Sequence, residues 1–175
     1  SSPALPVGLL CFFNQERSAG KSGISDLIDI GLTYRPYLKS YDMVMVPAGS
    51  PLAGKSVLTD KDIASKPLVT TNSFLRNVIS QRFGSDAISF SSTDFALRKD
   101  LVVRGAAHSF LPAFSQITMA KEQDFVLRDM EHPWEVEIGF VGTEEALSAE
   151  AFQGLVRILD EFYRAHLDSG LYTLP

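Results

Sequence analysis

The residues best suited to chemistry are a short run of hydroxyl and amide side chains, namely Thr70, Thr71, Asn72 and Ser73. The run follows a predicted strand at 68–69 and precedes apolar residues at helical spacing over 74–83, with Gly84 as a stop signal. One of these side chains would cap the helix, while the free N–H groups of its first turn face outward. Because a helix N-terminus carries a partial positive charge, it can seat a carboxylate, phosphate or sulfate. A plain capping role and a ligand-binding role both remain open.

A second run of the same kind follows a predicted strand at 88–90. Ser91, Ser92, Thr93 and Asp94 lead into another helical pattern that stops near Gly105. We take Ser92 and Thr93 as further candidate ligand contacts, since ligands in open α/β sheets bind at the carboxyl ends of strands.

Four further residues are candidates for the same site. His108 precedes a predicted short strand at 109–112 and could donate a hydrogen bond to a carboxylate, although a partly buried structural histidine is the more common case. Ser109 and Phe110 begin that strand, and Thr33 follows a predicted strand at 27–32. His108 and Ser109 do not form a catalytic pair, because adjacent strand residues point to opposite faces.

Several kinds of site have no signal in the sequence. There is no Gly-x-Ser-x-Gly elbow and no phosphate-binding glycine loop, and the histidines have no spacing typical of zinc ligands. We therefore predict no catalytic residue, no metal site and no cofactor, and we do not expect an enzyme.

Composition restricts the partners. The 175 residues carry a net charge of -5 with 45% hydrophobic content, and no Lys or Arg run forms a basic patch, which argues against direct nucleic-acid binding. Cys11 is the only cysteine, so an internal disulfide is impossible. No apolar run approaches the ~20 residues of a membrane span, and no signal-peptide pattern opens the chain. These features favour a cytoplasmic protein without a membrane partner.

Apolar runs and helical patterns alternate along the chain, which predicts an α/β fold with mostly parallel sheets flanked by helices. Further strands are expected at 7–13, 43–46, 125–127 and 136–141, with a chain break at 34–37. Thr59 and Asp62 form a predicted capping box. Ser148 is the expected cap of the last helix, whose apolar residues between Phe152 and Tyr163 indicate core or a subunit interface.

Six short motifs occur in a characteristic order: residues 28–32 (IDIGL), 42–46 with 50–54 (DMVMV, SPLAG), 58–67 (LTDKDIASKP), 68–71 (LVTT), 102–105 with 109–112 (VVRG, SFLP) and 148–152 (SAEAF). Their order and spacing resemble the effector-binding domain of LysR-type transcriptional regulators over roughly residues 5–167.

The resemblance implies a two-lobe fold like that of type II periplasmic binding proteins, with the ligand between the lobes. Residues 1–42 and 131–175 would form lobe I, and residues 43–130 lobe II. Lobe I would lack the strand and helix that usually open it. The ligand would be a small polar or anionic effector, and the domain would associate into dimers by antiparallel side-by-side packing, or into tetramers. DNA would be bound only by a winged helix-turn-helix domain that this sequence does not contain.

Two other functions share this fold. A solute-binding protein of a transport system would bind its ligand as a monomer, and a signal peptide in the gene product would favour it over the regulator. An enzyme on the same two-lobe fold would need a nucleophile or an acid–base cluster, and the sequence shows neither.

Overall fold

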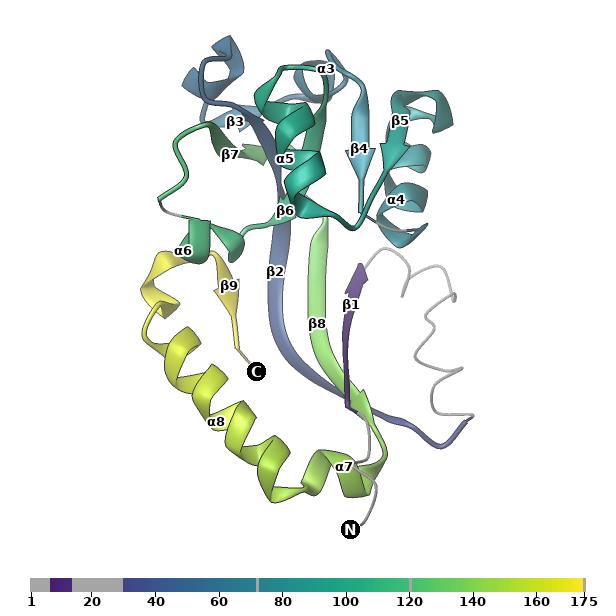
Figure 1. Cartoon of the computed structure of the whole chain (residues 1–175), viewed down its shortest axis with the longest axis vertical. Helices are drawn as coiled ribbons and strands as arrows, with labels where there is room; N and C mark the ends of the chain where they lie inside the picture. Colours follow the sequence, from purple (N-terminus) through teal and green to yellow (C-terminus); the bar gives the residue numbers. More distant parts are fainter. Residues whose placement is uncertain (1–6, 14–29, 72, 120, 175) are drawn as a thin grey trace. The chain divides into compact units, whose positions relative to one another are not determined.

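The structure, a computed structural model, describes residues 7–71, 73–119 and 121–174 except for residues 14–29. The chain divides into two compact units: residues 1–40 with 135–175, and residues 41–134. The division expected from the sequence, with lobe II over residues 43–130, differs from this by a few residues at each boundary. Figure 1 shows the elements of both units.

The elements of the first unit, in chain order, are β1 (Gly8–Phe13), the first part of β2 (Thr33–Pro47), β8 (Glu135–Gly142), α7 (Glu144–Ser148), α8 (Glu150–Arg164), the 3-10 turn η3 (Leu167–Ser169) and β9 (Tyr172–Thr173). Strand β1 runs antiparallel to β8, which is followed in the sheet by β2. Strand β9 pairs antiparallel with Lys39 and Ser40 of β2. Gly139 of β8 allows β2 to approach, because a Cβ at this position would lie 2.5 Å from the carbonyl oxygen of Arg35.

The core of the first unit is a cluster of aromatic rings between this sheet and α8. The ring centroid of Phe140 on β8 lies 5.2 Å from that of Tyr37 and 5.0 Å from that of Phe152. Tyr163, near the end of α8, contacts Tyr172 of β9 at 5.2 Å. These tilted and edge-on contacts fix the inner side of α8 against the sheet.

The elements of the second unit are the rest of β2, η1 (Pro51–Gly54), β3 (Val57–Leu58), α3 (Asp60–Ile63), β4 (Leu68–Thr70), α4 (Ser73–Phe83), η2 (Ser85–Ala87), β5 (Ile88–Ser91), α5 (Phe95–Val103), β6 (His108–Pro112), α6 (Ser115–Met119) and β7 (Phe125–Met130). Its strand order is β2–β6–β4–β5, with β7 also paired to β2 and β3 paired to β7. Helix α5 packs against β6 and β7, and α4 against β5 (Figure 1).

The core of the second unit forms around its central strands. Val44, Met45 and Val46 of β2 and Leu68 and Val69 of β4 are fully buried. The continuous apolar run of β2 is typical of a strand covered on both faces, which fits its central place in the order.

Parallel pairing is restricted to part of the structure. Strand β4 runs parallel to both β5 and β6, and β3 runs parallel to β7. Strand β2 runs antiparallel to β6, β7 and β9, as β1 does to β8. The α/β class is thus confirmed, whereas the mostly parallel pairing applies to the β4–β5–β6 sheet and not to its surroundings.

Two sequence predictions of elements were wrong. Ile30 and Gly31 form a turn, with φ of +79° at Gly31, instead of ending a strand, while residues 28–29 lie outside the described part of the chain. The predicted break at 34–37 lies within the fifteen-residue strand β2. Pro36 is tolerated there because β8 is the only described strand beside β2 at this level.

The caps were predicted with mixed success. The capping box of Thr59 and Asp62 is confirmed. Ser148, however, is the last residue of α7, and α8 begins after Ala149 without a side-chain cap. Within the described residues, no helix is long and apolar enough to cross a membrane.

Candidate functional site

The two hydroxyl-rich runs lie side by side at the carboxyl ends of β4 and β5. The parallel register of these strands places Thr70 opposite Ser91. Their hydroxyl oxygens are 3.0 Å apart, and the amide of Ser92 donates to the carbonyl of Thr70 at 2.9 Å. The register of a parallel pair therefore brings together two segments that are twenty-one residues apart in sequence. We call residues 70–71 and 91–94 the hydroxyl corner.

The members of the hydroxyl corner differ in their access to solvent. Thr70 is fully buried, so its hydroxyl supports the corner from within. Thr71 and Ser92 are half-buried and Thr93 is exposed, so these three side chains can meet a ligand. Asn72 lies outside the described residues. Ser73 is the first residue of α4, in a helix that begins where the sequence predicted.

The amino end of α5 is closed by its own cap. An oxygen of the Asp94 carboxylate accepts from the amides of Ala96 at 2.8 Å and Leu97 at 3.3 Å. The Ser92 hydroxyl in turn accepts from the amide of Asp94 at 3.0 Å. The expectation of outward-facing free amides is therefore wrong for this helix, because a negative group already occupies the positive end of the dipole.

Helix α4 differs from α5 in this respect. Its first turn contains no acidic residue, and its last turn carries Arg82. An anion near the hydroxyl corner would thus meet less repulsion at the start of α4 than at Asp94.

A buried arginine braces the corner from the other side of β4. Arg98 of α5 is only 4% exposed, and its Nη1 donates to the Ser109 hydroxyl at 3.2 Å and to the carbonyl of Phe110 at 3.4 Å. Ser109 passes the contact on by donating to the carbonyl of Val69 at 3.1 Å. Burial lowers the pKa of the Arg98 guanidinium, with Asp94 acting in the opposite direction.

His108 lies at the opposite end of the same strands. It is the first residue of β6, and it pairs with Leu68 at the start of β4. Its Nδ1 is 3.0 Å from the carbonyl of Ile63, and burial lowers the pKa of its imidazole. The structure therefore separates His108 from the hydroxyl corner and places it in a strand, where the sequence indicated a loop.

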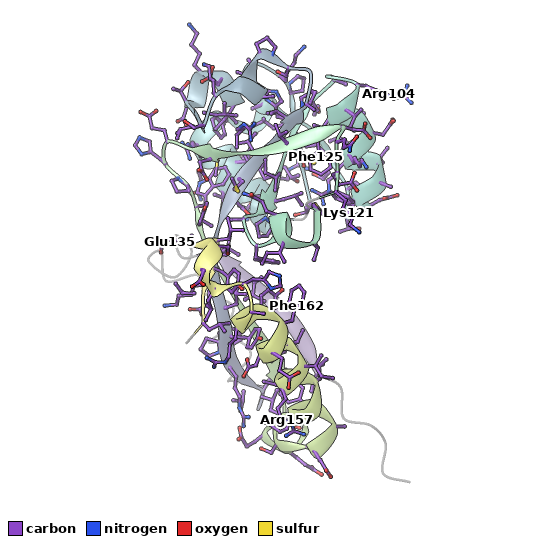
Figure 2. All side chains as sticks on the ribbon, turned by 90° about the vertical axis from the view of Figure 1, so that its left-hand side faces the viewer. Arg104, Lys121, Phe125, Glu135, Arg157 and Phe162 are labelled. Carbon is purple, nitrogen blue, oxygen red and sulfur yellow. The ribbon has the colours of Figure 1, made fainter. Side chains whose placement is uncertain are left out.

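A shallow pocket opens beside His108. It has a volume of about 350 Å³, and its lining includes Lys66, Asp124 and Arg104, the last at the end of α5 (Figure 2). This opening lies at the amino ends of the strands, which is not the edge where parallel sheets usually bind ligands.

The remaining sequence candidates have other surroundings. Ser109 is fully buried and braces Val69, as described above. Phe110 is 1% exposed, and its ring packs 5.2 Å from that of Trp134, which is a core contact. Thr33 is the half-buried first residue of β2 and belongs to the first unit.

Sequence reasoning missed the roles of two residues near the corner. Asp94 directly precedes the apolar pattern of α5, which is a common cap signal, but it was read only as part of a ligand-binding run. Arg98 follows one turn later and has no such local signal, because a buried arginine cannot be told from an exposed one by helical spacing alone. Among the described residues no group of three or more His, Cys, Asp or Glu side chains is placed to hold a metal ion.

The fold and the sequence are similar to one class of bacterial regulator. Residues 24–164 match the family of the LysR substrate binding domain. This match covers most of the chain, so the chain belongs to that family, and it is the effector-binding domain of a LysR-type transcriptional regulator. A search of curated protein sequences found no match.

Solved structures agree with this fold at low sequence identity. A chain from Pseudomonas aeruginosa assigned to the LysR family is 14% identical with a TM-score of 0.60, over 76% of this chain and 50% of that one. The regulatory domain of the LysR family regulator MetR from N. meningitidis is 15% identical with a TM-score of 0.57, over 83% and 69%. A cysteine mutant of OxyR from Corynebacterium glutamicum is 16% identical with a TM-score of 0.58, over 77% and 45%. This chain thus spans about half of the first of these proteins.

Proposed function

We propose that this domain senses a small polar or anionic metabolite, which it binds at the hydroxyl corner of the second unit. The observation that carries the proposal is the 3.0 Å contact between the hydroxyls of Thr70 and Ser91, because it brings two strand-to-helix turns to one place. Such turns present backbone amides and hydroxyls toward a ligand.

Thr71 and Ser92 are the proposed principal contacts, with Thr93 at the rim. Thr71 and Ser92 are half-buried, so a bound ligand would shield their hydroxyls from water without requiring Thr70 to move. Thr70 and Ser109 act as positioning residues, since their hydroxyls bond to other parts of the protein.

The charges of the two helix starts suggest how the ligand is oriented. Its anionic group would face the first turn of α4, which contains no acidic residue. Its hydroxyl or other donor group would face Ser92 and the Asp94 side. A dianion with charge at both ends would be a poor ligand, because one end would approach the Asp94 carboxylate.

In the whole regulator, this binding would shift a conformational equilibrium of the domain and so alter transcription. DNA would be contacted by an N-terminal winged helix-turn-helix domain, and the domain described here would assemble into dimers or tetramers in the cytoplasm. Membership in the family supports these parts of the proposal and gives no reason to expect catalysis.

Isothermal titration calorimetry of the 175-residue chain with a panel of small carboxylates and hydroxy acids tests the site. For any compound that binds, we expect Thr71→Ala and Ser92→Ala each to weaken binding by about 5- to 10-fold, equivalent to about 1 kcal/mol for a lost hydrogen bond. Ser65→Ala is the matched control, because this exposed serine follows α3 near the opposite end of β4.

The outcomes are distinct. Loss of affinity in both corner variants with wild-type affinity in Ser65→Ala would support the site. Unchanged affinity in both corner variants would remove the hydroxyl corner from the binding surface.

A further inference from the structure

Helix α8 carries a second apolar side that faces solvent. Its inner side is anchored by Phe152, which is 8% exposed, whereas Leu155, Ile158 and Phe162 are 49%, 66% and 40% exposed. These three residues recur at intervals of three and four, so they form one continuous stripe along the helix. A surface helix of a monomer normally presents polar residues on this side, and this exposed stripe therefore suggests a partner.

The charged residues of α8 leave this stripe free. Glu150, Arg157, Glu161 and Arg164 lie together on one flank of the helix, as its periodicity of 3.6 residues requires. Figure 2 shows Arg157 and Phe162 along α8. The stripe is bordered by small residues instead, which are Ala151, Gly154 and Ala165. Small residues let the backbone of another helix come close.

The stripe is complementary to itself in size. If two copies of α8 pair antiparallel with Ile158 on the two-fold axis, a residue before Ile158 meets the residue equally far after it in the partner copy. Gly154 and Phe162 are each four positions from Ile158, so each phenylalanine meets a glycine. Ala151 and Ala165, each seven positions away, meet one another.

The same register also matches the polar ends of the stripe. Glu150 and His166 are each eight positions from Ile158, and both are exposed. The ring of His166 stacks on Phe162 at 5.0 Å, and its Nδ1 lies 2.8 Å from the Phe162 carbonyl, which holds the ring beside the stripe. The acidic residue at the start of one helix would thus meet the imidazole at the end of the other, an arrangement that antiparallel helix dipoles favour.

We propose that the exposed stripe of α8 is an interface between two copies of this chain, paired antiparallel about Ile158. A fifteen-residue helix is about 22 Å long. One helix pair of this length is a small interface, so we expect reversible association in the micromolar range. The contact is separate from the hydroxyl corner, and it stands whether or not the corner binds an effector.

Sedimentation velocity of the 175-residue chain over a wide concentration range tests this interface. We expect Ile158→Glu to remove one step of association, because it places two like charges together on the axis. Gly154→Leu should do the same by filling the space that Phe162 of the other copy needs. Gly154→Leu should also melt no lower than the parent, since a Cβ there has its nearest neighbour at 3.7 Å and leucine favours helix over glycine.

Leu97→Glu is the matched control, because Leu97 is also an exposed leucine on a helix, but in the second unit. Wild-type association in Leu97→Glu with loss in both α8 variants would support the proposal. Wild-type association in Ile158→Glu or in a folded Gly154→Leu, or a parent chain that stays monomeric at all concentrations, would overturn it. Effector binding measured on the same variants keeps this result separate from that of the hydroxyl corner.

Discussion

Arg98 of α5 and Ser109 of β6 form a buried hydrogen bond, with 3.2 Å between Nη1 and the hydroxyl oxygen. Ser109 donates onward to the carbonyl of Val69, which is the residue before Thr70. This pair therefore connects a helix to the strand end that forms the hydroxyl corner. No hydrogen-bond partner of the Arg98 Nε is found within the described residues, so the cation is buried with only part of its donors satisfied.

The first prediction concerns the stability contributed by Arg98. Arg98→Ala should reduce the free energy of unfolding by about 2–4 kcal/mol, because it leaves a cavity and removes the donor to the Phe110 carbonyl. Arg98→Met should cost about 1 kcal/mol or less, since the side-chain stem still packs and the desolvated charge is gone. Urea unfolding of both variants measures the difference. Equal losses would show that the charge itself stabilises the fold.

The second prediction concerns the bond between Thr70 and Ser91. Thr70→Val keeps the shape of the side chain and should cost about 1 kcal/mol. Ser91→Ala should cost less, because Ser91 is exposed. In a double-mutant cycle by urea unfolding, we expect a coupling energy of about 0.5 to 1 kcal/mol. A coupling energy of zero would mean that the two strand ends are not held together by this contact.

The third prediction concerns Asp42 of β2. Burial raises the pKa of its carboxyl to about 7, and its Oδ2 has no hydrogen-bond partner within the described part of the chain. Because the unfolded carboxyl titrates near about 3.9, the folded chain holds an extra proton between these values, and stability falls as the pH rises from about 4 to about 7. The total decline is about 4 kcal/mol.

Asp42→Asn should remove this decline and be more stable than the parent above about pH 7, with little difference near about pH 4. Urea unfolding at several pH values measures it. Asp86→Asn, at an exposed position of η2, serves as the control. Parallel stability curves for the parent and Asp42→Asn would exclude the buried carboxyl as the cause.

The fourth prediction concerns His108. Burial lowers the pKa of its imidazole, so as the pH falls the unfolded chain takes up the proton first, near about 6.5. The stability contributed by neutral His108 is therefore present above this pH and is lost as the pH falls below it. His108→Gln keeps a donor for the Ile63 carbonyl and should reduce the loss of stability in acid. His132→Gln, at an exposed position, should leave the acid branch unchanged.

Local signals were enough to predict the helices of the second unit. Gly84 marks the end of α4, and the capping box of Thr59 and Asp62 marks the start of α3. Both signals act through bonds or backbone angles within one turn of chain, and so they are readable without the fold.

Elements that depend on distant partners were not predictable in this way. Arg35 and Pro36 read as a break, yet β2 continues through them because Gly139 of β8 lets the two strands approach closely. Ser148 carries a good capping side chain, but Thr143 caps a separate short helix first, and Ser148 becomes its last residue. Tertiary contacts decided both cases.

The hydroxyl corner lies between these cases. Each of its two runs was identified from sequence, since hydroxyl residues before a helical pattern are a local signal. Their adjacency depends on β5 lying next to β4, and the separation of His108 depends on β6 running parallel to β4. Strand order and register are not contained in any single segment, so only the structure could separate His108 from the corner.

The most direct test of the hydroxyl corner is a titration followed by two-dimensional NMR of the amide groups. With a small carboxylate that binds, we expect the largest shift changes at Thr71, Ser92 and Thr93, and little change at Lys66, Arg104 and His108 at the opposite edge. The largest changes around His108, with unmoved signals at the hydroxyl corner, would contradict the proposed site.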